Sequence, residues 1–313
     1  MEVAVMVDSE TGMSAASWLA LAELADRTEL DALVRSDHYA GTHSSQLDCL
    51  DAWSACAAAA ARTSRIALGT LVSPITFRHP AVLAKTVATV CALGGNRRVD
   101  VGIGLGWNSH EHAVAGLAFP AAAIRYRMVE EYLTVLRALW AEGPGSFSGQ
   151  YYTLASADFH PKPTPAPRII IGKRGRPRSL ALAAAHADEY NLVFQPAEAC
   201  TEIRRRLHEL AEQLGRATPR LSIMTDFILG RDNDEITARL ATAAIHNPRL
   251  VGADATTLPA PYLAGKPADL LAALRNYRDH GVDRVILKHP DPTDLASIEL
   301  LATHVLPHLA QEG

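Results

Sequence analysis

Asp37 and His38 stand next to each other in the stretch VRSDHYAG, directly after a short apolar run. An acid beside an imidazole is a pairing that catalytic sites use, because histidine exchanges protons near neutral pH. The same residue types are also common in turns, where Asp hydrogen-bonds to nearby backbone groups. The dipeptide alone therefore leaves two interpretations open, a turn and a catalytic pair.

A second stretch, GKRGRPR at 172–178, lies between a predicted strand and a predicted helix. Gly172 and Gly175 allow the backbone to approach an anion closely, and the N-terminus of the following helix offers unpaired N–H groups and a positive dipole. Positive charge is added by Lys173, Arg174, Arg176 and Arg178. A solvated basic loop is the alternative, but the position between strand and helix favours a phosphate site.

Glycines occupy alternate positions in the stretch GIGLGWN, at Gly102, Gly104 and Gly106. The stretch does not match the G-x-G-x-x-G dinucleotide fingerprint. Glycines inside a strand permit the close approach of a ligand or of another backbone. A flat ring across a barrel mouth and tight packing between elements both remain open for this motif.

Eight short apolar runs, each followed by a helical pattern, must position these residues. The predicted strands are 3–7, 31–36, 65–72, 98–106, 168–172, 189–194, 221–229 and 283–288. The predicted helices are 14–28, 50–63, 80–93, 127–142, 179–187, 198–215, 235–246 and 296–309. Continuously apolar strands indicate a parallel sheet covered by helices. Eight such units favour an α/β fold of the (β/α)8 TIM-barrel type, formed as one domain over 1–313, over an open doubly wound sheet.

Two segments interrupt the alternation. Residues 143–167 are rich in Gly and Pro and predict an inserted loop with a short hairpin. Residues 247–267 predict a second long connection. Loops of this length in a compact domain are usually functional or disordered.

In a β/α barrel the active site lies at the C-terminal ends of the strands. The predicted ends bring together Asp8, Ser36, Asp37, His38, Leu71, Val72, Gly106, Trp107, Asn108, His110, Glu111, Gly172, Lys173, Arg174, Gly175, Phe194, Gln195 and Leu229. Asp37 and His38 thus fall on a rim with polar residues from other strands, which favours the catalytic interpretation over a simple turn.

Composition excludes several classes of function. The chain has 313 residues and a net charge of −4, so the basic excess of a nucleic-acid binder is missing. Its four cysteines form no C-x-x-C pair, and HEH at 110–112 has no standard zinc-ligand spacing, so we predict no metal site. No signal peptide or membrane-spanning run is found, which predicts a cytoplasmic protein without a membrane partner.

Several segments, in their order and spacing, resemble the luciferase-like monooxygenase superfamily. They are RSDHY (35–39), RIALGTLVSPITFRHPAVLAKTVATV (65–90), VGIGLGWNSHEHAVAGLAFP (101–120), RYRMVEEYLTVLRALW (125–140), FSGQYY (147–152) and HADEYN (186–191). The likeness covers nearly the whole chain and is greatest to the branch that depends on coenzyme F420, a deazaflavin. The resemblance implies a bacterial-luciferase-like TIM barrel, bound F420 or, alternatively, FMN, and redox chemistry on a small organic molecule.

The resemblance also implies roles for individual residues. His38 would lie near the cofactor ring as an acid/base or electrostatic partner, with Asp37 beside it, and both would contact the cofactor. Leu71 and Val72 would be joined by a cis peptide bond that supports one face of the ring. The fourth-strand cofactor segment would comprise Gly104, Gly106, His110 and Glu111. The loop whose amides hold the cofactor phosphate would comprise Gly172, Lys173, Arg174 and Gly175.

The chain departs from the family pattern at two places. Trp107 stands where the sugar-phosphate dehydrogenases of this branch carry a catalytic Glu, which argues against glucose-6-phosphate dehydrogenase activity. Lys173 and Arg174 stand where the phosphate loop commonly has glycine and small residues. Two consequences stay open: their charge could favour the longer anionic tail of the deazaflavin, or the loop could bind phosphate less closely.

Three functions follow from these observations. The first is F420-dependent hydride transfer between deazaflavin C5 and a small organic substrate, by a homodimer. The second is a reduced-FMN monooxygenase that uses O2 and a separate flavin reductase, and the third is a non-catalytic cofactor-binding relative. Residues 40–48, 107–120 and 247–266 are expected to line the substrate pocket, and their apolar and small polar content suggests an uncharged substrate.

Overall fold

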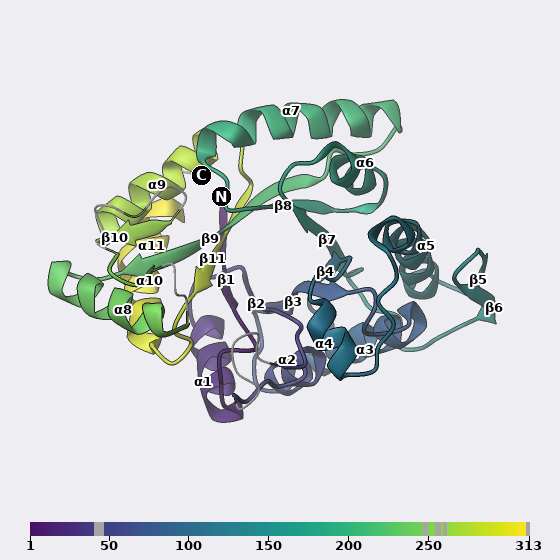
Figure 1. Cartoon of the computed structure of the whole chain (residues 1–313), viewed down its shortest axis with the longest axis horizontal. Coiled ribbons are helices and arrows are strands. Elements are labelled where there is room, and N and C mark those ends of the chain that lie inside the picture. The colour runs from purple at the N-terminus through teal and green to yellow at the C-terminus, as the bar shows by residue number, and fades with distance from the viewer. Residues whose placement is uncertain (41–46, 247–249, 254–257, 259–261, 311–313) are drawn as a thin grey trace.

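The computed structural model describes residues 1–40, 47–246, 250–253, 258 and 262–310 of the chain. Eight parallel strands form its barrel: β1 (Glu2–Val7), β2 (Ala32–Arg35), β3 (Ala67–Pro74), β4 (Val99–Gly104), β7 (Arg168–Lys173), β8 (Glu189–Val193), β9 (Arg220–Leu229) and β11 (Arg284–His289). The ring closes because β11 pairs with β1 and β8 pairs with β9 (Figure 1). The predicted TIM barrel is confirmed, and the open doubly wound sheet is wrong.

Helices surround the ring of strands (Figure 1). They are α1 (Ala15–Asp26), α2 (Ala52–Ala60), α3 (Pro80–Leu93), α4 (Ser109–Val114), α5 (Ala122–Trp140), α6 (Pro177–His186), α7 (Ala197–Gln213), α8 (Asn233–His246), α9 (Pro267–Asp279), α10 (Leu295–His304) and α11 (Leu306–Ala310). Local sequence starts several of them: Ser14 and Asp51 cap α1 and α2 through side-chain acceptors, and α3, α6 and α9 begin with proline. No helix within the described ranges is long and apolar enough to cross a bilayer.

The inserted segments are more structured than the sequence indicated. The predicted hairpin is present as β5 (Gly145–Ser148) paired antiparallel with β6 (Thr153–Ala157). The second connection contributes β10 (Leu263–Gly265), which extends the sheet beside the end of β9. Helices α4 and α9 were not predicted. Helix α4 is short and polar, and α9 buries only the narrow stripe formed by Leu270, Leu274 and Tyr277.

A buried ionic network closes the N-terminal end of the barrel. Arg284 has no exposed surface and donates to Asp100 at 2.6 Å, Asp31 at 2.8 Å and Glu189 at 3.0 Å. Burial raises the pKa of Asp100, but Arg284 and Arg98 outweigh it and hold that pKa at about 2. These charges therefore stay paired inside the protein, where an unpaired charge would be costly.

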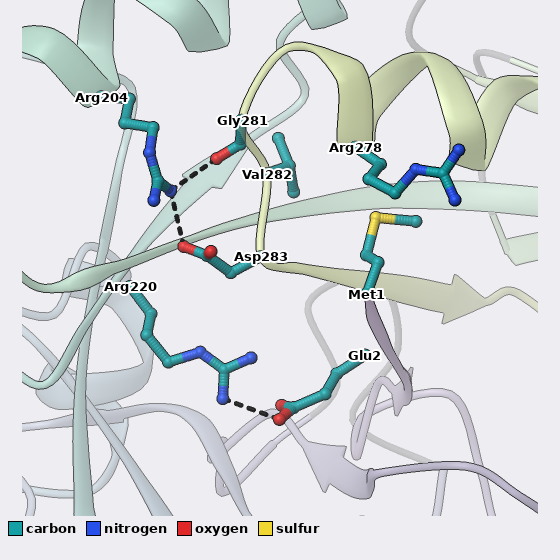
Figure 2. A pocket seen from close by; sticks show the side chains of 8 residues that line it. All are labelled: Met1, Glu2, Arg204, Arg220, Arg278, Gly281, Val282 and Asp283. Carbon is teal, nitrogen blue, oxygen red and sulfur yellow. Dashed lines mark hydrogen bonds and ion pairs between the residues drawn. The ribbon is translucent and has the colours of Figure 1, made fainter. Parts of the chain in front are cut away.

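A hollow of about 410 Å³ lies at this same end of the molecule (Figure 2). Its lining residues are Met1, Glu2, Arg204, Arg220, Arg278, Gly281, Val282 and Asp283. Arg204 donates to Asp283 and Arg220 donates to Glu2, so these arginines are held by carboxylates of the barrel base. The hollow is far from the C-terminal strand ends, where a barrel enzyme carries its active site.

Small and apolar side chains fill the barrel above the ionic network. This interior cluster comprises Ala4, Met6, Ala32, Val34, Ala67, Leu71, Ile170, Met224 and Ile286. Successive strand residues point to opposite faces of the sheet, so the residue two positions after an inward residue also points inward. Counted from Met6, Met224 and Ile286, these next inward residues are Asp8, Asp226 and Lys288. The apolar layer seals the barrel, and these three polar residues form the floor of its mouth.

Candidate active site

His38 lies just beyond the end of β2, on the rim of the barrel mouth. Its Nδ1 atom is 2.9 Å from Oε2 of Glu111, and its Nε2 atom is 3.8 Å from Oε1 of Glu10. The indole ring of Trp107 meets the imidazole edge-on, with 5.8 Å between ring centroids. Trp107 is 69% exposed, so a large apolar side chain stands open to a ligand directly beside the histidine.

Helix α4 holds Glu111 in place. The side chain of Asn108 caps this helix by accepting the Glu111 N–H at 3.1 Å. The Glu111 carboxylate accepts the backbone N–H groups of Tyr39 and Ala40 and is almost fully buried. Glu111 thus ties the segment that follows β2 to the segment that follows β4.

The electrostatics of this cluster favour a charged pair. Burial lowers the pKa of His38, but the hydrogen bond to Glu111 and the charges of Glu10, Glu111 and Asp8 outweigh it, so that pKa is raised. Burial raises the pKa of Glu111, but the His38 and Tyr39 hydrogen bonds outweigh it, so that pKa is lowered. A protonated imidazole held in this way can give a proton to a substrate oxygen.

Asp37 occupies a different environment from its neighbour. It has no exposed surface, accepts from the Ser73 hydroxyl at 2.6 Å and pairs with Arg78 at 2.5 Å. Burial raises the pKa of Asp37, and Arg78 and Ser73 oppose that rise. Asp37 is fully buried in this structure, and its contact with the cofactor and its part in catalysis stay predictions. It anchors the turn that presents His38.

Glycines at alternate positions of β4 make room for the neighbouring strand. The Leu71–Val72 peptide bond is cis, as predicted, and the register of β3 shifts there. A Cβ atom on Gly104 would lie 2.4 Å from Cγ2 of Val72, and one on Gly102 would lie 2.3 Å from the Thr70 carbonyl oxygen. Of the two interpretations left open by the sequence, tight packing between elements therefore explains Gly102 and Gly104. Val72 is itself half-buried, so its side chain still borders the mouth.

The remaining residues of the fourth-strand segment differ in their exposure to solvent. Gly106 has a φ of +77°, which favours glycine, and leads the chain into α4. His110 is exposed, and its cofactor contact stays a prediction. His112 was not predicted: it is buried and bonds to the Thr76 hydroxyl at 2.6 Å and the Asn108 carbonyl at 2.7 Å.

The basic loop connects β7 to α6, as predicted. Gly175 has a φ of +72°, and its N–H already donates to the Tyr190 hydroxyl at 3.0 Å, so that amide is not free for a phosphate. In the described part of the chain no side chain caps the N-terminus of α6. Lys173 is half-buried, and burial together with Arg176 and Arg125 lowers its pKa. Gly172 and the exposed Arg174 flank Lys173.

Three polar residues, Asp8, Asp226 and Lys288, lie on the floor of the mouth. The sequence pattern placed Asp8 at the rim without a role and did not predict Asp226 or Lys288 as site residues. The Lys288 ammonium is 2.7 Å from Oδ2 of Asp8 and 3.8 Å from Oδ1 of Asp226. Burial raises the pKa of Asp226 to about 6, although Lys288 opposes that rise. The sequence did carry a pattern that could have found them, because each lies two residues beyond an inward apolar residue of its strand. Among the described residues, no group of three His, Cys, Asp or Glu side chains could hold a metal ion.

Known proteins resemble this chain at the levels of family, sequence and structure. The profile of the luciferase-like monooxygenase family matches residues 1–287. An F420-dependent glucose-6-phosphate dehydrogenase from Segniliparus rotundus is 27% identical over 316 residues, 91% of each chain. An uncharacterized protein from Mycobacterium bovis is 34% identical over 167 residues, which cover 53% of this chain and 55% of that protein.

Solved structures share the fold. An F420-dependent secondary alcohol dehydrogenase in complex with an F420–acetone adduct superposes with a TM-score of 0.80 at 20% identity, over 97% of this chain and 98% of the other. A monooxygenase from Streptomyces bottropensis superposes with a TM-score of 0.81 at 24% identity, over 99% of this chain and 100% of the other. At these identities the likeness concerns the fold alone.

Proposed function

The chain belongs to the luciferase-like monooxygenase family, and within it we propose an F420-dependent oxidoreductase that transfers a hydride between deazaflavin C5 and a small organic substrate. The observation that carries the proposal is the buried His38–Glu111 pair at the barrel rim, next to the exposed ring of Trp107. The 27% identity to an F420-dependent dehydrogenase over 91% of the chain supports the same choice of cofactor.

The residues present fit a deazaflavin. The bulged Val72 would border the ring, since its side chain is half-buried at the mouth beside Gly104. The N-terminus of α6, which has no side-chain cap among the described residues, would hold the phosphodiester, with Lys173 and Arg174 near the anionic tail. When bound, the deazaflavin supplies or accepts a hydride at C5.

The chain's own residues would manage the proton that accompanies the hydride. Reduction of a carbonyl requires one proton for the developing alkoxide, and His38 would donate it through Nε2, because Nδ1 is held by Glu111. Asp37 would position the loop through Arg78, and Glu10 would favour the charged imidazole. In the oxidative direction His38 would accept that proton.

The reduced-FMN monooxygenase stays the alternative, because monooxygenases share this fold at TM-scores of about 0.8. That reaction requires O2 and a partner reductase, whereas hydride transfer to or from F420 requires neither. The further predictions of a homodimer, a cytoplasmic location, and no nucleic-acid or membrane partner accompany the F420 proposal.

Anaerobic turnover by a His38→Ala variant tests the proposal. We expect wild-type protein to oxidise reduced F420 without O2 in the presence of a panel of small ketones, imines and activated alkenes. His38→Ala should bind F420 as wild type does and lose about 10²-fold or more of this rate, since general acid–base catalysis contributes about 10²–10⁴-fold. A strict requirement for O2 and reduced FMN would instead establish the alternative.

A further inference from the structure

The side chain of Asp226 is a buried carboxylate at the barrel mouth with few interaction partners among the described residues. It lies at an inward position of β9 and is only 4% exposed. Within the part of the chain that the structure describes, its carboxylate accepts no hydrogen bond, and its ion-pair partner Lys288 is 3.8 Å away. Buried polar groups normally have hydrogen-bond partners, so a carboxylate at a barrel mouth that keeps free acceptors is suited to accept from a ligand donor.

Lys288 and Asp8 face the same space. Their side chains are each 22% exposed although both lie on the barrel interior, so the volume above them is open. An ammonium group has three N–H donors, and in the described residues Asp8 takes one of them at 2.7 Å. The remaining donors of Lys288 are available beside the unused acceptors of Asp226.

The spacing of these two groups suits one oxygen atom of a ligand. Hydrogen-bonded atoms lie about 2.8 Å apart. Two atoms separated by 3.8 Å can therefore both contact a single oxygen placed between them. A hydroxyl group would accept from Lys288 and donate to Asp226, and a carbonyl oxygen would accept from Lys288.

The charges of the mouth discriminate against anions. Among the described residues, the ion pairs around His38 and Lys288 combine these two cationic groups with four carboxylates, those of Asp8, Glu10, Glu111 and Asp226. Lys288 is already neutralised by Asp8, so an incoming phosphate or carboxylate would meet net negative charge in a partly buried site.

We propose that Lys288 and Asp226 bind a neutral hydroxyl or carbonyl group of the substrate, and that the mouth excludes anionic substrates such as sugar phosphates. This inference rests on the proposed function, because it names the substrate class of that same site. It assigns a specificity-determining role to two residues on the floor of the mouth.

Matched probes test the inference. Cyclohexanol and trans-4-hydroxycyclohexanecarboxylate have the same ring and hydroxyl and differ in one negative charge. Their dissociation constants are measured on the protein–F420 complex at pH 8, through the change in F420 fluorescence. We expect cyclohexanol to bind at least tenfold more tightly than the carboxylate. Asp226→Asn and Lys288→Met should each weaken cyclohexanol binding at least tenfold, and Lys288→Arg should weaken it less than Lys288→Met.

Two controls separate the possible failures. F420 is first titrated alone into every variant, and Asp279→Asn, an exposed surface change, should leave all the constants unchanged. If F420 does not bind wild-type protein, the proposed function fails and the inference fails with it. If F420 binds but the two probes bind equally or not at all, or the floor variants bind cyclohexanol as wild type does, the inference alone is overturned.

Discussion

Replacing Glu111 with Gln should lower the pKa of His38. The substitution keeps the size of the side chain but removes the charge 2.9 Å from Nδ1. A hydrogen bond between charged groups contributes about 1.5–3 kcal/mol and a neutral one about 0.5–1.5 kcal/mol. Loss of the charge therefore removes about 1–1.5 kcal/mol of stabilisation from the protonated imidazole, so the pKa of His38 should fall.

The same pair makes stability depend on pH. The folded pKa of His38 is raised, so its contribution is full below its ordinary value of 6.5 and is lost as the pH rises through the folded value. The folded pKa of Glu111 is lowered, so its contribution is present above its ordinary value of 4.5 and is lost as the pH falls through the folded value. The stability difference between wild type and Glu111→Gln should therefore be largest between these two values.

Two measurements check this prediction. The pKa of His38 is followed by NMR of the imidazole nitrogens, with the signal identified by comparison with His38→Gln, because the chain has 13 histidines. Urea unfolding of wild type and Glu111→Gln is compared at pH 5.5 and pH 9. Glu10→Gln is the matched control, and it should have the smaller effect, because Glu10 is 3.8 Å from His38 and forms no hydrogen bond with it in the described structure. An unchanged His38 pKa, or the same loss of stability at both pH values, would refute the reasoning.

Other predictions concern the barrel and the cofactor loop. Gly104→Ala should reduce stability by about 1–3 kcal/mol, because its Cβ would lie 2.4 Å from Val72; Gly172→Ala, with 3.5 Å to the same side chain, should cost less in the same urea experiment. Arg284→Met should destabilise the protein by about 3–5 kcal/mol by leaving Asp100 and its neighbours unpaired, and thermal unfolding measures this loss. Arg174→Ala should weaken F420 binding by a factor of 2 to 5 at low salt, because an exposed ion pair contributes ~0–1 kcal/mol. At 1 M salt the substitution should have little effect, because salt screens exposed charges. An equal effect at both salt concentrations would contradict the prediction.

The order of the barrel strands could be predicted because each strand is a continuous apolar run with a helical pattern after it. The turn that carries His38 and the bulge at Leu71–Val72 follow two of these runs, so their place on the rim could also be predicted. Helix α9 and strand β10 could not, because they follow a long connection and bury few side chains. Helix α9 is stabilised by packing against elements that are distant in the sequence, and a local sequence pattern does not show such contacts.

The partners within the site were harder to predict than its location. The distance from His38 to Glu10 depends on how the chain after β1 turns back over β2, through the bond from Ser36 to Glu10. The burial of Asp37 depends on Arg78, which lies 41 residues later. Neither contact leaves a local pattern in the sequence. Lys288 and Asp226 could have been found by counting inward positions along their strands.

Comparative titration of F420 and FMN tests the central claim most directly. Both cofactors are titrated into the protein and followed by fluorescence, at low and at high salt. F420 carries more negative charge than FMN, so the basic loop should give it the tighter binding, and the preference should shrink as salt screens the exposed charges of Arg174 and Arg176. Tighter binding of F420 at low salt is the result that the F420 proposal predicts, and tighter binding of FMN at both salt concentrations would contradict it.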